Sequence, residues 1–159
     1  MKRITFSFFV LAFILSFSYA HALEKEGKYK SYLGWTSTGN TVEVGPNHTF
    51  FTGEFTGTNF NDSGEGFLHE TSFVCPGAMD TNKGKYNGHG YCVVTDNEGD
   101  KAFLAWKCNG EEFCRGDFQW TGGTGKYEGL SGDNTFFALI GIGGTAEGYS
   151  VSEGVWKLP

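Results

Sequence analysis

The sequence predicts an all-β fold, a single antiparallel barrel of about eight strands that follows a cleaved signal peptide. Short runs of β-branched and aromatic residues recur about every ten residues, separated by Gly, Asn and Asp, which is typical of barrels and sandwiches. Helical periodicity is hard to find after residue 23. The chain has 159 residues with 25 glycines but only 3 prolines, and this length suits one domain.

The predicted strands are separated by turn sequences that favour chain reversal, such as 61–64 and 97–100. In chain order, the predicted strands are residues 28–35, 41–44, 49–57, 66–75, 88–95, 102–108, 116–120, 135–142 and 149–158. No linker or break in composition divides them. We therefore expect one barrel domain over residues 23–159.

Residues 1–22 have the pattern of a secretory signal peptide. A short cationic start precedes an apolar run over 4–17, which is short for a membrane span, and the small residues Ala20 and Ala22 precede the expected cut. The alternative is an uncleaved N-terminal anchor. Cleavage leaves 10 basic and 18 acidic residues in segment 23–159, a formal net charge of −8. We expect an exported protein, periplasmic or extracellular, that binds neither nucleic acid nor, after cleavage, a membrane.

The four cysteines are Cys75, Cys92, Cys108 and Cys114, an even number that favours disulfides in an exported chain. Zinc sites usually contain closely spaced cysteine pairs, whereas the separations here are 17, 16 and 6. We therefore expect no metal at these residues. Of the three possible pairings, we prefer Cys75–Cys92 with Cys108–Cys114, because both bridges then close hairpins.

The preferred pairing predicts which side chains share the inner face of the sheet. If Cys75 faces Cys92, the two strands are antiparallel and the numbers of paired residues sum to about 167. Alternation through the next two hairpins then separates large rings from charged groups, as expected for a sheet with one buried face. The predicted inner face comprises Phe67, His69, Phe73, Val94, Leu104, Trp106, Phe118 and Trp120. The predicted outer face includes Glu70, Ser72, His89, Tyr91, Lys107, Asp117 and Gln119.

Three segments resemble a known family. Residues 119–132, with the run Gly-Gly-Thr-Gly-Lys-Tyr-Glu-Gly, are similar to the glycine-rich hairpin of allene oxide cyclase and dirigent proteins, and closest to uncharacterised bacterial secreted relatives of that superfamily. Residues 51–57 and 146–159 fit the same group. The resemblance implies an eight-stranded antiparallel barrel, often a dimer or trimer, with an apolar axial cavity that steers a reactive intermediate in the cyclase and dirigent branches. The family's catalytic acids have no matching positions here, so no catalytic residue is assigned.

The candidate ligand-binding residues are His69, Phe73, Trp106, Phe118, Trp120 and Tyr127. His69 on an apolar face suits an acid–base group or a ligand donor, and the alternative is a buried, hydrogen-bonded histidine. The neighbouring Glu70 points the other way along a strand, which excludes a direct pair with His69. The aromatic residues either line a pocket or fill a narrow barrel. The alternating acids Asp96, Glu98 and Asp100 indicate a solvated turn more than a calcium loop.

We expect a barrel that binds a small apolar or aromatic molecule, without a cofactor. One alternative is an isomerase or cyclase of the allene oxide cyclase or dirigent type; another is a structural barrel with a filled interior that acts through its surface or as a homo-oligomer. The sequence has no G-x-S-x-G or H-E-x-x-H motif, and whether the protein is an enzyme stays open. An interior cavity of roughly a few hundred cubic ångströms favours the first two readings over the third, and polar groups converging in it favour the cyclase.

Overall fold

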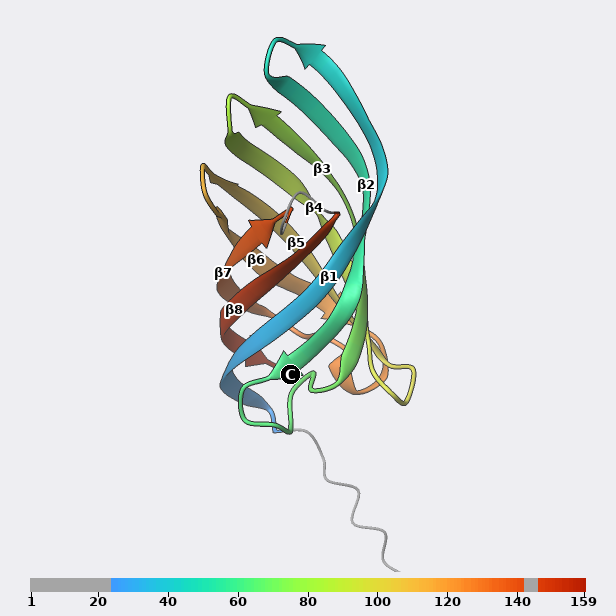
Figure 1. Cartoon of the computed structure of the whole chain (residues 1–159). Helices are drawn as coiled ribbons and strands as arrows, with labels where there is room; N and C mark the ends of the chain where they lie inside the picture. Colours follow the sequence, from blue (N-terminus) through green and yellow to red (C-terminus); the bar gives the residue numbers. More distant parts are fainter. Residues whose placement is uncertain (1–23, 142–145) are drawn as a thin grey trace, which may run out of the picture.

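The computed structural model describes residues 24–141 and 146–159, and it confirms the predicted all-β barrel (Figure 1). The strands pair antiparallel in chain order, and β8 pairs with β1 to close the barrel. The elements are β1 (Glu26–Gly45), β2 (His48–Asn61), β3 (Thr71–Asn82), β4 (Lys85–Thr95), β5 (Lys101–Gly110), β6 (Cys114–Gly123), the 3₁₀ helix η1 (Gly125–Tyr127), β7 (Gly132–Ile140) and β8 (Glu147–Lys157). The predicted signal peptide, residues 1–22, lies outside the described residues.

The strands differ in length, so the two ends of the barrel differ. The β1–β2 hairpin rises furthest at one end, and the β3–β4 hairpin follows it (Figure 1). At the other end, which we call the closed end, the loop 62–70 and the segment 124–131 connect the strands. Within the described part of the chain, no helix is long and apolar enough to cross a membrane.

The prediction of two strands over 28–35 and 41–44 is wrong, because β1 runs through both without interruption. Gly39, which lies between the two predicted strands where we expected a turn, is directly opposite Gly53 of β2. A Cβ atom on Gly39 would lie 2.7 Å from the Cα of Gly53, so only glycine allows the two backbones to approach this closely. This glycine therefore allows β1 and β2 to pair closely and does not mark a chain reversal.

The register predicted from the cysteines is confirmed. Paired residues of β3 and β4 sum to 167 along the ladder, as in Phe73 with Val94. Both predicted disulfides, Cys75–Cys92 and Cys108–Cys114, are formed. The predicted inner residues of β3 to β6 point inward, whereas His89 and Lys107 are exposed.

The predicted strand 66–75 is wrong in its first half, because β3 begins only at Thr71. Leu68 and Glu70 adopt left-handed backbone conformations, with φ of 53° and 52°, so strand alternation does not extend through this segment. Side chains hold the loop instead: the Asn59 amide donates to the Leu68 carbonyl (2.5 Å) and the Asn61 amide donates to the Phe67 carbonyl (2.9 Å). Residues 66–70 are therefore a loop that folds over the closed end.

Aromatic rings seal the closed end. Phe67 stacks on Trp156, with ring centroids 4.6 Å apart and an interplanar angle of 8°. Its ring also meets Trp120 at 5.6 Å and Tyr29 at 5.3 Å in edge-to-face geometry. Tyr127 of η1 also packs on Phe67 at the closed end, and its side chain is only 2% exposed. We call these five rings the aromatic plug.

The glycine-rich hairpin that carries the family resemblance is fastened to the β4–β5 turn. The Lys126 ammonium lies 2.7 Å from Asp96 and 2.9 Å from Glu98, and its backbone N–H donates to Asp100 (3.0 Å). The three acids can bring carboxylate oxygens within 4.8 Å of one another. Because Lys126 already binds this acidic cluster, the geometry favours an ion-pair network over a cation site.

Lys126→Met should lower stability near neutral pH and much less in acid. Partial burial acts to raise the pKa of Asp96, but its bonds to Lys126 and to the backbone N–H groups of Glu98 and Asp100 hold that pKa below the ordinary 3.8. A depressed carboxyl pKa contributes stability above its ordinary value, and the contribution is lost as the pH falls below about 4. Urea unfolding across this range measures the effect.

Lys85→Met is the matched control, because its partner Glu111 lies 2.9 Å away but both side chains are about 70% exposed. Exposed ion pairs contribute little to stability, so this variant should show a smaller pH-dependent loss. Equal pH dependence in the two variants would contradict a special role for the Asp96–Lys126 pair.

Candidate ligand cavity

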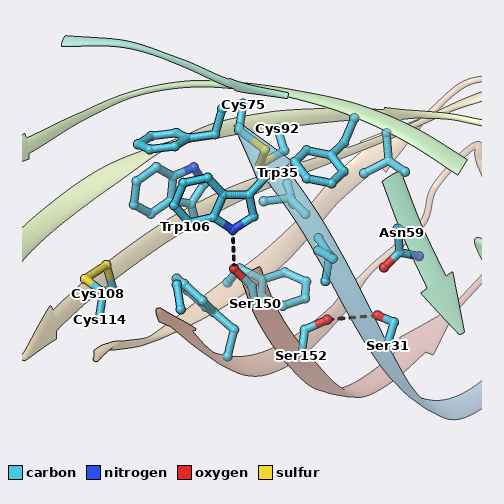
Figure 2. A pocket seen from close by; sticks show the side chains of 18 of the residues that line it. Ser31, Trp35, Asn59, Cys75, Cys92, Trp106, Cys108, Cys114, Ser150 and Ser152 are labelled. Atoms are coloured by element: carbon cyan, nitrogen blue, oxygen red, sulfur yellow. Dashed lines mark hydrogen bonds between the residues drawn. A yellow bond between two sulfur atoms is a disulfide. The ribbon is translucent and has the colours of Figure 1, made fainter. Parts of the chain in front are cut away.

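A cavity of about 120 Å³ lies inside the barrel, and all eight strands contribute to its wall (Figure 2). Leu68 of the loop 62–70 and Tyr29 of the aromatic plug bound it at the closed end. The volume is smaller than the few hundred cubic ångströms that we expected of a ligand-binding or enzymatic barrel as opposed to a filled one. An engineered cavity of about 150 Å³ in another protein accepts benzene, so this space suits a molecule built on one ring.

The cavity wall is mainly aromatic. Phe55 meets Trp35 at 5.3 Å and Trp106 at 6.0 Å, both in edge-to-face geometry, and Trp106 meets Phe136 at 6.3 Å. The Trp35 indole N–H donates to the Ser150 hydroxyl (2.9 Å), which fixes the position of that ring (Figure 2). The rings thus form a continuous wall that bends around the space, with faces and edges available to a flat guest.

Trp106 lies flat against the barrel wall because the strand beside it carries glycine. A Cβ atom on Gly90 would lie 2.8 Å from both Cζ2 and Nε1 of the indole. The ring therefore occupies the space that a side chain at this position would take.

Both disulfides belong to the cavity wall. Figure 2 shows Cys75–Cys92 and Cys108–Cys114 as separate bridges along it. The inward positions of Cys75 and Cys92 follow from the alternation that places Phe73 and Val94 inside, and Cys108 and Cys114 share the inner face with Leu104 and Phe118 of their own strands. One bridge therefore links β3 to β4 and the other links β5 to β6, both within the cavity wall.

Hydroxyl, amide and indole groups form the polar part of the wall. Ser31 of β1 and Ser152 of β8 share a hydrogen bond of 2.9 Å (Figure 2). Burial raises the pKa of the Tyr29 hydroxyl well above its ordinary value, and the neighbouring Ser152 and Trp120 offset only part of this rise. Of the described residues that line the cavity, none is Asp, Glu, His, Lys or Arg. The wall is therefore uncharged, and Tyr29 stays protonated at physiological pH.

Four of the six predicted site residues line the cavity: Phe73, Trp106, Phe118 and Trp120. Tyr127 does not, because it lies in the aromatic plug behind Phe67.

His69 also lies outside the cavity, because it belongs to the loop 62–70 rather than to a strand. Its Nδ1 accepts a hydrogen bond from the Asn61 backbone N–H (3.2 Å), and its ring lies edge-on to Phe60 of the outer barrel face. Its Nε2 is 3.8 Å from Glu70, so the expectation that these neighbours point apart is wrong. The physical reason is the left-handed backbone on both sides of His69, which removes strand alternation.

The polar part of the cavity wall was not predicted from the sequence. Tyr29 and Ser31 occupy alternate positions of the strand that also carries Trp35, and this alternation is the signal that could have shown them to share its face. Ser152 and Asn59 had no such signal, because small polar residues usually indicate the outer face of a strand.

No protein-family model, curated protein or solved structure matches the chain significantly. The resemblance to allene oxide cyclase and dirigent proteins stays a prediction. The cavity combines an aromatic wall, a few neutral hydrogen-bonding groups and a volume close to that of one ring.

Proposed function

We propose that the protein binds a small uncharged aromatic or apolar molecule inside the barrel, without covalent catalysis. The observation that carries the proposal is an aromatic cavity to which no described residue contributes an ionisable acid, histidine or basic group. A charged guest would lose its hydration without gaining a counter-charge, which costs several kcal/mol or more. A neutral guest loses little and gains contact with the rings.

We also infer that this binding takes place in an oxidising compartment. Both cysteine pairs are bridged, and disulfides of this kind form and persist mainly in exported proteins. The signal-peptide pattern of residues 1–22 supports the same inference. A secreted carrier or scavenger of small hydrophobic compounds fits these properties.

The second candidate is an isomerase or cyclase that holds a reactive substrate in one conformation. Ser31, Ser152 and Asn59 line the cavity, and the two serine hydroxyls are hydrogen-bonded to each other; these polar groups favour this candidate. Such an enzyme needs a cavity that fixes the conformation of its substrate and neutral groups that polarise the substrate, rather than an acid–base pair. Chemical conversion of the bound molecule separates the two candidates.

The test is native mass spectrometry of the protein purified from its own source, followed by calorimetric titration with one-ring compounds. Val94→Phe places a ring inside the cavity and should abolish binding, because Val94 is an inward wall residue. Val93→Phe is the matched control, since the adjacent residue points to the outer face, and its binding should equal that of the wild type. Equal binding by both variants would place the ligand elsewhere and refute the proposal.

A further inference from the structure

One hydrogen-bond acceptor in the cavity wall has no donor within the described part of the chain. Asn59 lies near the end of β2, is 6% exposed and lines the cavity. Its side-chain N–H donates to the Leu68 carbonyl at 2.5 Å, whereas no described group donates to its Oδ1. An amide oxygen can accept two hydrogen bonds, so this side chain keeps bonding capacity that the fold does not use.

The direction of the Asn59 amide follows from its partner. A backbone carbonyl accepts hydrogen bonds and never donates them, so the group that faces Leu68 must be the NH₂. The amide oxygen then lies on the other side, and Figure 2 shows it directed toward the interior. The contact with the loop 62–70 therefore aims an acceptor into the cavity.

The other polar groups of the wall are bonded or enclosed. Ser31 and Ser152 form a hydrogen bond with each other. The indole N–H groups of Trp106 and Trp120 are shielded within the wall, so a molecule in the cavity cannot reach them. Asn59 differs, because its unbonded oxygen is not one of the shielded atoms. It is the polar group best placed to meet a guest.

Asn59 lies at the same level of the barrel as Ser150. Both pair with Leu33 of β1, one from each side, and all three residues line the cavity. Trp35, the next inward residue of β1, donates its indole N–H to Ser150 at 2.9 Å and is held in place by it. A guest bonded to Asn59 can therefore lay its ring over Leu33 and against Trp35.

We propose that the ligand is a neutral one-ring molecule that donates an N–H or O–H hydrogen bond to the Asn59 side-chain oxygen, as an aromatic amine or a phenol does. This inference rests on the proposed function and narrows it from apolar molecules in general to neutral aromatic donors. The volume of about 120 Å³ suits one ring with a small substituent. An ammonium group would also donate, but no described lining residue carries a negative charge to compensate it.

The first test compares aniline with toluene, which has nearly the same shape, by isothermal titration calorimetry near pH 7, where aniline is neutral. Without an acceptor in the cavity, burial of the amino group would favour toluene by about tenfold or more. Because Asn59 accepts its N–H, aniline should bind as tightly as toluene or more tightly. Phenol, compared with toluene in the same way, distinguishes O–H from N–H donors. A clear preference for toluene over both donors would overturn the inference.

Two asparagine variants locate the acceptor. Asn59→Leu should weaken aniline binding about tenfold relative to toluene binding, the effect of about one neutral hydrogen bond. Asn61→Leu is the matched control, because the Asn61 amide also anchors the loop, donating to the Phe67 carbonyl at 2.9 Å, but Asn61 does not line the cavity. This control should leave the ratio of the two affinities unchanged. An unchanged ratio in Asn59→Leu would overturn the assignment to Asn59, and the wild-type comparison does not depend on the folding of either variant.

The outcomes separate this inference from the proposed function. Binding of toluene with rejection of aniline and phenol would overturn the donor assignment and leave the apolar binding site intact. Tighter binding of benzylamine, a cation near pH 7, than of aniline would overturn the assignment to neutral ligands. Failure of the folded wild type to bind any of the three neutral probes would refute the proposed function as well.

Discussion

Phe67→Ala should lower the free energy of unfolding by about 3–5 kcal/mol, the usual cost of removing a buried phenylalanine ring. Phe67 is 5% exposed and contacts four other rings of the aromatic plug. Its stacked partner Trp156 belongs to β8, and Tyr29 belongs to β1, the two strands whose pairing closes the barrel. The cavity left by the alanine would be large because rigid rings surround it and collapse poorly. Urea unfolding measures the change.

Phe60→Ala is the matched control for this prediction. Phe60 lies only seven positions earlier, on the outer face of β2, and is 46% exposed. Because much of its ring is already in water, its loss should cost about 1 kcal/mol or less. A similar cost for both variants would show that the plug is not a principal source of stability at the closed end.

The fold was accessible to sequence reasoning because two independent patterns constrain it. Alternation assigns inner and outer faces within each strand, and the disulfide between Cys75 and Cys92 aligns two strands against each other. An error of one residue in register would have moved Trp106 and Phe118 to the outer face. The agreement of polarity with register therefore made the prediction for β3 to β6 well determined.

His69 shows where such reasoning fails. Phe67, His69, Thr71 and Phe73 alternate as a strand would, and both phenylalanines are indeed buried. The pattern is accidental for the first two, because left-handed residues turn the chain over the closed end before β3 begins. Gly66, with φ of 83°, is an ordinary turn signal at the start of the predicted strand, but Leu68 and Glu70 are not residues that usually indicate a turn. The burial of Phe67 and Phe73 was predictable, but the position of His69 in a loop outside the cavity was not.

The polar part of the cavity wall could not be predicted without knowing how the barrel closes. Ser31 and Ser152 are 121 positions apart and meet only because β8 pairs with β1. Neither strand carries a cysteine that could align it with the rest of the sheet. A serine in a strand is also equally compatible with an exposed position, so these residues carry no signal of their own.

Trp106→Ala should have a large effect on both stability and binding. Its ring contacts both buried clusters of the interior: the one that includes Phe118 and Trp120, and the one around Met79 and Ala138. Trp35 and Phe136 also contact both clusters, but the loss of the large indole leaves a cavity between them, so the free energy of unfolding should fall by about 3 kcal/mol or more. The same ring forms part of the cavity wall, so one-ring compounds should bind at least about tenfold more weakly to the folded variant.

His89→Ala is the control, because His89 lies on the strand adjacent to Trp106, opposite Lys107, and points to the outer surface. An exposed side chain away from special contacts usually changes stability by no more than about 0.5 kcal/mol, and binding should not change. The two variants therefore compare the inner and outer faces of neighbouring strands at nearly the same height in the barrel. Weaker ligand binding by His89→Ala, with normal binding by Trp106→Ala, would locate the site on the outer surface and defeat the proposal of an interior ligand.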